Sequence, residues 1–237
     1  MISCLWSNMA NIGKITGTLV YRGTSEEVEI AGTKWSLYNS CPSFTFRCAV
    51  DGENVLWSCA ARGRITAWDL RTLRDTKMYF DCMNTKDGYA CNGSDFFAYN
   101  QTIRSFEADI EVINIRRIDL SSPSNEAIDS PEDAACLEVE GKKLWVSKKT
   151  LSLDSPVFKT MFSGDSKEKA TGCYALEEVK MDDLKLFLCV LYNLDITVRK
   201  EEFLEGLLRL GDKYQCDRVL RFCRIVGCQV KRQRCVW

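Results

Sequence analysis

Apolar and polar residues follow two different rhythms along this chain, and the change of rhythm divides it into two parts. Between Thr16 and about Arg117 they alternate in short runs, as in Glu27–Ile30 and Asp109–Ile115. Alternation with a period of two is typical of β-strands that bury one face and expose the other. Turn residues recur about every eight to twelve residues, the spacing expected of a β-sandwich. Residues 1–120 are therefore predicted to form an antiparallel β-sandwich.

The predicted strands of this part are short, and each ends at a turn signal. They are Gly17–Tyr21, Glu27–Ile30, Trp35–Tyr38, Phe44–Cys48, Val55–Cys59, Arg64–Trp68 and Asp109–Ile115. Residues 88–94 are polar and contain two glycines, a composition typical of a mobile loop. No helix of ordinary length is expected before residue 120.

A segment rich in serine, proline and acidic residues separates the two parts. It spans residues 121–132 and contains Pro123 and Pro131, which interrupt regular structure. We therefore predict a linker there. A second domain follows over residues 133–226, and then a short basic tail over residues 227–237.

The second part combines a few strands with helical spacing. Cys136–Val146 is predicted to form a hairpin that turns at Glu140–Gly141, and a further strand is expected near Cys173–Leu176. Asp182 and Asp183 are predicted to cap a helix, because carboxylates accept hydrogen bonds from free amides at a helix N-terminus. The predicted helices are Pro156–Phe162, Leu184–Tyr192, Glu201–Tyr214 and Asp217–Val226. The expected fold class is α+β, a small sheet packed against paired helices.

Composition supports folded domains and narrows the chemistry. The chain has 237 residues, of which 46% are hydrophobic, enough for packed cores. Its 32 basic and 33 acidic residues give a net charge of -1, so no domain-wide positive potential exists to hold a nucleic acid. The sequence contains no histidine, which excludes histidine bases, histidine-activated nucleophiles and histidine zinc sites. We predict no catalytic, cofactor-binding or metal-binding residue and do not expect an enzyme.

Thirteen cysteines are scattered along the chain without a Cys-x-x-Cys pair. Cys189 lies in an apolar run, where a thiol packs as a small hydrophobic group. The sequence shows neither a secretory signal nor an apolar run of about 20 residues, so we expect a protein of the cytoplasm, the nucleus or both, with reduced thiols. Cys216, Cys223 and Cys228 lie close enough in sequence for a thiolate cluster, an arrangement that the lack of a fourth ligand disfavours.

Two short blocks of the second part resemble the BTB (POZ) domain family. Ser155–Phe158 and Asp212–Gln215 follow one another in the family's order, roughly fifty residues apart, and Leu144–Lys149 precedes them. The resemblance covers about Asp133–Val226 and is strongest to the BTB domains that are expanded in nematodes. Ser147 stands where many of these domains carry histidine, and we expect it to make an internal hydrogen bond.

The N-terminal part is similar to the MATH domain, a β-sandwich that often precedes a BTB domain in the same chain. Ile30–Leu37 and Leu56–Ala61 fit the family's early strands, and Phe96–Val112 fits the closing strands. The resemblance implies a sandwich that holds a substrate as an extended peptide along a sheet. Three tryptophans of this part, Trp35, Trp57 and Trp68, either line such a groove or pack in the core. Core packing is the commoner role for aromatic residues in sandwiches.

The BTB resemblance implies dimerisation and the binding of a cullin scaffold, through which a RING protein ubiquitinates the bound substrate. Carried over by motif, the cullin-contact residues are Phe162, Ser166, Glu168 and Tyr192. Ser166 stands where the family has an apolar anchor, and a buried serine gains little. Ser166 thus weakens the expected contact with cullin. The family resemblance as a whole still leads us to expect the substrate-recognition subunit of a cullin-RING ubiquitin ligase. The alternative is a BTB scaffold that homo- or hetero-oligomerises without recruiting cullin.

Two further features bear on these expectations. Residues 121–133 lack the helical stripe that many BTB dimers exchange between protomers. Residues 227–237 leave little length for the helical extension that completes the cullin surface in many adaptors. Without the exchanged helix, dimerisation is expected to be less stable or to use only the helical surface. Ser166 and the short C-terminal segment favour the alternative of an oligomerising scaffold.

Overall fold

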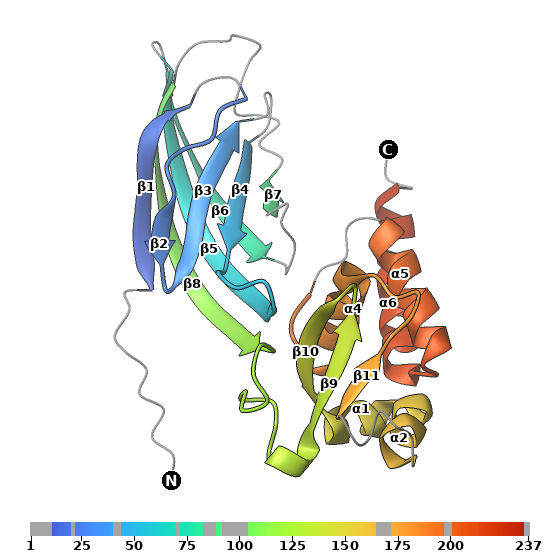
Figure 1. Cartoon of the computed structure of the whole chain (residues 1–237). Helices are drawn as coiled ribbons and strands as arrows, with labels where there is room; N and C mark the ends of the chain where they lie inside the picture. The colour runs from blue at the N-terminus through green and yellow to red at the C-terminus, as the bar shows by residue number, and fades with distance from the viewer. Residues whose placement is uncertain are drawn as a thin grey trace. The chain divides into compact units, whose positions relative to one another are not determined.

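The computed structural model of the chain describes residues 11–19, 22–39, 44–69, 72–82, 89–91, 104–164, 172–196 and 201–234. The described residues fall into two compact units (Figure 1). The first unit lies within residues 1–51 and 58–116, and the second within residues 52–57 and 117–237. Among the described residues, no helix is long and apolar enough to cross a membrane.

The first unit consists of two four-stranded sheets that face each other (Figure 1). The strand order is β1-β8-β5-β6 in one sheet and β2-β3-β4-β7 in the other. Every strand pair with a defined register is antiparallel, which confirms the predicted antiparallel architecture. The strands are β1 (Ile12–Leu19), β2 (Val28–Ile30), β3 (Thr33–Asn39), β4 (Phe44–Ala49), β5 (Val55–Asp69), β6 (Thr72–Cys82), β7 (Tyr89–Cys91) and β8 (Arg104–Asp119).

Close packing between the two sheets is visible where β1 meets β2. A Cβ atom added at Gly13 would lie 2.6 Å from Cδ1 of Ile30, so only glycine fits there without displacing the isoleucine. Ile30 is 2% exposed, and Ile15, the next inward residue of β1, is also buried. The alternation read from the sequence therefore corresponds to side chains that fill the space between the sheets.

Trp35 occupies the core of the first unit. Its side chain is fully buried, and its indole Nε1 donates a hydrogen bond to Oγ1 of Thr33 at 2.7 Å. The Thr33 hydroxyl in turn donates to the carbonyl oxygen of Ile30 at 2.6 Å, so every polar atom of this pair is satisfied inside the protein. Trp57 is also buried, which confirms the core role for these two residues. The side chain of Trp68 lies outside the described residues.

The strand predictions for the first unit were wrong at three places. The two strands expected on either side of Arg62 are one continuous strand, β5, because Gly63 keeps its place in the ladder opposite Met78 of β6. Strand β6 was not predicted. Tyr89–Cys91, expected in a loop, forms β7 by pairing with β4, a long-range contact that polar composition does not reveal.

The second unit is an α+β fold built on a three-stranded sheet (Figure 1). The strand order is β10-β9-β11, with β9 antiparallel to β10 and parallel to β11. The elements are η1 (Pro131–Asp133), β9 (Ala134–Val139), β10 (Lys142–Ser147), α1 (Lys148–Asp154), α2 (Pro156–Ser163), β11 (Cys173–Ala175), α4 (Met181–Leu191), α5 (Glu201–Lys213) and α6 (Asp217–Arg234).

The turn between β9 and β10 lies where it was predicted. Glu140 and Gly141 have φ angles of 51° and 75°, and they form a two-residue connection between paired strands. Two successive residues with positive φ give the turn whose twist matches that of antiparallel strands. Glycine is needed here because an L side chain rarely adopts this backbone conformation.

Helices α4, α5 and α6 supply most of the core beside this sheet. Leu184 and Phe187 of α4 are fully buried, as are Leu207 and Leu210 of α5, so each helix turns an apolar face inward. Helix α6 was expected to end at Val226 but continues to Arg234, through residues predicted to be a basic tail. Its added segment is rich in lysine, arginine and glutamine, which are good helix formers.

Candidate protein-interaction site

Helices α1 and α2 lie at one end of the second unit and are fixed by two capping serines. Ser147 caps α1, since its Oγ accepts a hydrogen bond from the backbone N of Thr150 at 3.0 Å. Ser155 caps α2 in the same way, accepting from the backbone N of Phe158 at 3.1 Å. Pro156 follows as the first helical residue, a position where the missing N–H costs nothing. The internal hydrogen bond expected of Ser147 is thereby confirmed.

The two sequence blocks that carry the family resemblance meet in space. Ser155 Oγ also donates to the carbonyl oxygen of Tyr214, 59 residues further along the chain. The rings of Phe158 and Tyr214 stack with centroids 4.4 Å apart. Ser155 and Phe158 come from the first block and Tyr214 from the second. The two blocks, although far apart in the sequence, thus form one contact in the folded domain.

An aromatic cluster extends from this contact. Phe187 lies 6.3 Å from Phe158 and 5.9 Å from Tyr214, measured between ring centroids. Phe162 stacks on Phe158 at 5.8 Å and meets the ring of Tyr174 edge-on at 5.1 Å. Aromatic pairs at these separations stabilise a core beyond the area they bury. The cluster joins α2, β11, α4 and the end of α5.

Asp183 links α4 to α5 and does not cap α4. Its side chain is 10% exposed, and Oδ2 accepts a hydrogen bond from Nη2 of Arg209 at 2.8 Å. The predicted capping by Asp182 and Asp183 was wrong, because α4 begins at Met181 and its N-cap residue makes no side-chain capping bond. Instead Oε2 of Glu140, in the β9–β10 turn, accepts from the backbone N of Met181 at 3.2 Å.

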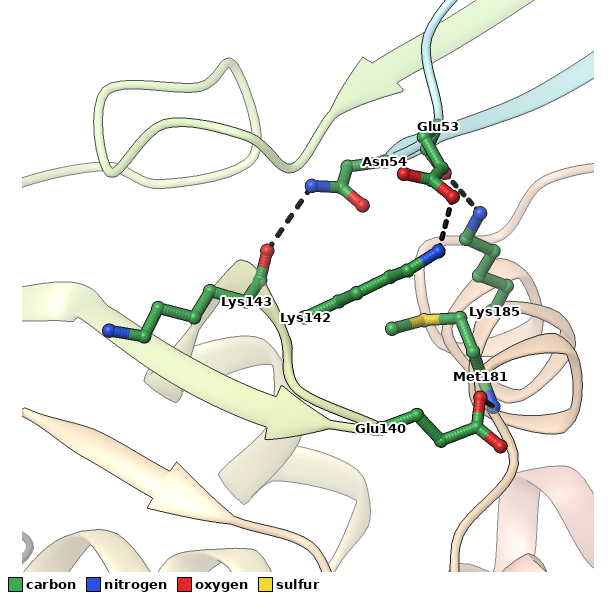
Figure 2. Close-up of polar contacts among 7 residues, drawn as sticks. All are labelled: Glu53, Asn54, Glu140, Lys142, Lys143, Met181 and Lys185. Atoms are coloured by element: carbon green, nitrogen blue, oxygen red, sulfur yellow. Dashed lines mark hydrogen bonds and ion pairs between the residues drawn. The ribbon is translucent and has the colours of Figure 1, made fainter.

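Figure 2 shows a second set of polar contacts on the same hairpin, made by residues 52–57 of the second unit. Glu53 forms an ion pair with Lys142, and its carbonyl oxygen accepts from Nζ of Lys185 in α4. Asn54 Nδ2 donates to the carbonyl oxygen of Lys143 at 3.3 Å. Residues 52–57, which are distant in sequence, thus contribute polar contacts to the hairpin and α4. No local signal in the sequence predicts these contacts.

A further ion pair fixes the end of α1 to α6. Arg218 Nη1 lies 3.2 Å from Oδ2 of Asp154, and Nη2 donates to Oδ1 of Asn193 at 3.2 Å. Next to Asp154, Leu153 is 82% exposed, and Ile225 on α6 is 62% exposed. Most of each of these apolar side chains is available to a partner.

The structure places two of the four predicted cullin-contact residues. Phe162 is 9% exposed and belongs to the aromatic cluster. The Tyr192 hydroxyl accepts a hydrogen bond from the backbone N of Ser147 at 3.0 Å, and burial raises the pKa of Tyr192 to about 12. Ser166 and Glu168 lie outside the described residues. The assignment of these four residues to a cullin surface stays a prediction.

Two of the three thiols considered for a metal cluster, Cys216 and Cys223, are buried. Cys216 and Cys223 are at most 2% exposed, and burial raises the pKa of Cys223 to about 11. A protonated thiol is a poor metal ligand. The side chain of Cys228 is outside the described set, within which no three histidine, cysteine or acidic side chains gather as a metal site would require.

Comparison with known proteins identifies the second unit. The sequence model of the BTB/POZ domain family matches residues 133–230. A curated relative, BTB and MATH domain-containing protein 38 of Caenorhabditis elegans, is 34% identical over 87 residues, which are 37% of this chain and 22% of the relative. This match therefore spans about a fifth of the relative's length.

A solved structure, the BTB domain of zebrafish PATZ1, is similar at a TM-score of 0.34 and 19% identity, covering 40% of this chain and 75% of that one. The expected resemblance of the second part is confirmed by the family match, which begins at the residue where the second domain was predicted to start. The chain thus contains a BTB/POZ protein-interaction domain over residues 133–230.

Proposed function

We propose that the protein is the substrate-recognition subunit of a cullin-RING ubiquitin ligase. The BTB domain would dimerise and bind the cullin, and the N-terminal two-sheet unit, as a MATH-like domain, would hold the substrate. The observation that carries this proposal is the BTB/POZ match over residues 133–230. The name of the nematode relative combines BTB and MATH, which supports a MATH-like role for the N-terminal unit.

The test is direct binding between the purified full-length chain and a purified cullin. Glu168→Lys should abolish binding, because it reverses a charge at the predicted contact. Glu205→Lys makes the same change on an exposed residue of α5 and should leave binding intact. Equal binding by both variants would reject the predicted surface, and no binding by the unmodified chain would reject the ligase role.

A scaffold that oligomerises without cullin is the second candidate, and two observations favour it. Phe162 is packed in the aromatic cluster, and the hydroxyl of Tyr192 is bonded internally to Ser147. Both side chains are thus engaged within the domain rather than offered to a partner. The scaffold would still use exposed apolar side chains such as Leu153 and Ile225.

Light scattering coupled to size-exclusion chromatography measures the oligomeric state, and variants of Leu153 in α1 and Ile225 in α6 show which helix carries the contact. Leu153→Glu and Ile225→Glu each place a charge on an exposed helical position, so neither should unfold the domain. A variant that converts an oligomer to a monomer identifies the helix that carries the contact. A chain that is monomeric at every concentration would reject oligomerisation.

A further inference from the structure

Two thiols lie side by side in the sheet of the BTB domain. Cys136 in β9 and Cys173 in β11 are directly paired across the parallel strands, and their Sγ atoms are 3.0 Å apart. Neighbouring strands lie about 4.8 Å apart, within the roughly 4.4–6.8 Å between Cα atoms that a disulfide requires. The sheet therefore holds both sulfurs where a bond between them needs little movement.

The two thiols differ in their access to solvent. Cys136 is 1% exposed, whereas Cys173 is partly exposed. Burial raises the pKa of Cys136 to about 12, so this thiol is protonated at neutral pH. A small oxidant therefore reaches the sulfur of Cys173 first. Cys136 is then the thiol that lies beside the oxidised sulfur.

A carboxylate lies close to the partly exposed thiol of Cys173. Cys173 Sγ donates to Oε2 of Glu138 at 3.8 Å, and Glu138 is two residues from Cys136 on the same strand. The contacts of the Cys173 sulfur with Cys136 and with Glu138 are both made to β9, so they hold this sulfur beside its partner thiol.

We propose that Cys136 and Cys173 form a reversible disulfide when the protein meets a hydroperoxide. The sulfur of Cys173 attacks the O–O bond, becomes a sulfenic acid and releases one water molecule. The sulfur of Cys136 then attacks the sulfenic sulfur and releases a second water molecule. Two thiols and one hydrogen peroxide thus give one disulfide and two waters, and both thiol protons leave in water. A dithiol reductant reverses the bond.

The bond would change how β11 is held. This strand has three residues, and the backbone bonds at its two ends are Cys136 N to the Gly172 oxygen and Leu176 N to the Glu138 oxygen, both 2.9 Å. These bonds break and re-form as a short strand end opens. A disulfide would join β11 covalently to β9, the central strand of the sheet. The pairing of β11 with β9 would then persist in the oxidised domain, whereas it opens transiently in the reduced domain.

The experiment uses the full-length chain, reduced and freed of reductant, then treated with equimolar hydrogen peroxide. Remaining thiols are alkylated, and the protein is digested without reduction and analysed by mass spectrometry. We expect a linked peptide pair containing Cys136 and Cys173, which dithiothreitol removes. Cys173→Ser should abolish the link, and Cys223→Ala, which changes another buried thiol, should leave it intact.

Cys136→Ser provides a second readout that a chance linkage would not reproduce. The sulfenic acid on Cys173 then has no thiol beside it, so dimedone should trap it in this variant and much less in the unmodified chain. Equal trapping in the two proteins would overturn the attack of Cys136 on the sulfenic sulfur. Recovery of both cysteines as alkylated thiols, or of Cys173 as a sulfinic acid with no linked peptide, would overturn the proposal itself.

Discussion

Gly206 of α5 lies against Asp183 of α4, and this contact should reverse the usual effect of alanine in a helix. In an unobstructed helix, alanine is about 1 kcal/mol more favourable than glycine. A Cβ atom at residue 206 would lie 2.7 Å from Oδ2 of Asp183 and closer still to Oδ1 and Cγ. The carboxylate is held by Arg209 at 2.8 Å, so moving it aside weakens an ion pair.

The magnitude follows from three contributions. Crowding a packed contact costs about 1–3 kcal/mol. The ion pair adds at most about 1 kcal/mol, because the Arg209 side chain is 54% exposed and solvent screens the interaction. The helix preference of alanine offsets about 1 kcal/mol. Gly206→Ala is therefore expected to lower the free energy of unfolding by up to about 3 kcal/mol, where an unobstructed helix would gain about 1 kcal/mol.

Urea unfolding followed by far-ultraviolet circular dichroism measures this change, and Gly227→Ala is the matched control. A Cβ atom at Gly227 would lie 3.6 Å from Cδ2 of Leu204, an ordinary contact, so that variant should gain up to about 1 kcal/mol. The double variant Asp183→Ala, Gly206→Ala removes the obstruction and should be more stable than Gly206→Ala alone. A Gly206→Ala protein that gains stability as Gly227→Ala does would show that the carboxylate is not fixed there.

Three further predictions concern the same domain. Ser155→Ala removes both the cap of α2 and the donor to the Tyr214 carbonyl. Urea unfolding should show that it lowers the free energy of unfolding by about 2–4 kcal/mol, against about 1 kcal/mol for Ser147→Ala. Equal losses would contradict the double role of Ser155. Burial raises the pKa of Tyr192 and of Tyr214 to about 12 from 10.0, so their contribution to stability is complete below pH 10 and is lost as the pH rises from 10 to 12. Tyr214→Phe should flatten that decline, and an absorbance titration with every tyrosine ionising near pH 10 would refute it. A Cβ atom added at Gly141 would have no other atom within 4 Å, so Gly141→Ala introduces only backbone strain. The same urea assay should show a loss of about 1 kcal/mol in the free energy of unfolding, and a loss several times larger would contradict this reasoning.

Features that depend on neighbouring residues were predictable from the sequence. The turn at Glu140–Gly141 is an example, because a short connection between two apolar runs restricts the backbone to a few conformations. The stripe through Leu207 and Leu210 is another, since a helix brings residues three and four apart onto one face. In both cases the information lies within a few residues of the structure it specifies.

Features that depend on distant partners were not predictable. Asp182 and Asp183 are good capping residues by type, yet the hydrogen bond at the start of α4 is made by Glu140, 41 residues earlier. Residues 52–57 include the start of the predicted strand Val55–Cys59, and nothing local assigns them to the second unit. Phe162 was placed by its motif, but the direction of its ring is decided by Phe158 and Tyr174.

The contact between Ser155 and Tyr214 has a consequence for synthesis of the chain. Helix α2 has eight residues, too few to be stable in water without partners. Its stacking ring and the acceptor for its capping serine arrive 59 residues later, which at a translation rate of about 5–20 residues per second is a delay of roughly 3–12 s. Until then the apolar side chains of Phe158 and Phe162 have no core to enter. A nascent chain paused within this interval is therefore a ligand for chaperones that bind exposed aromatic segments.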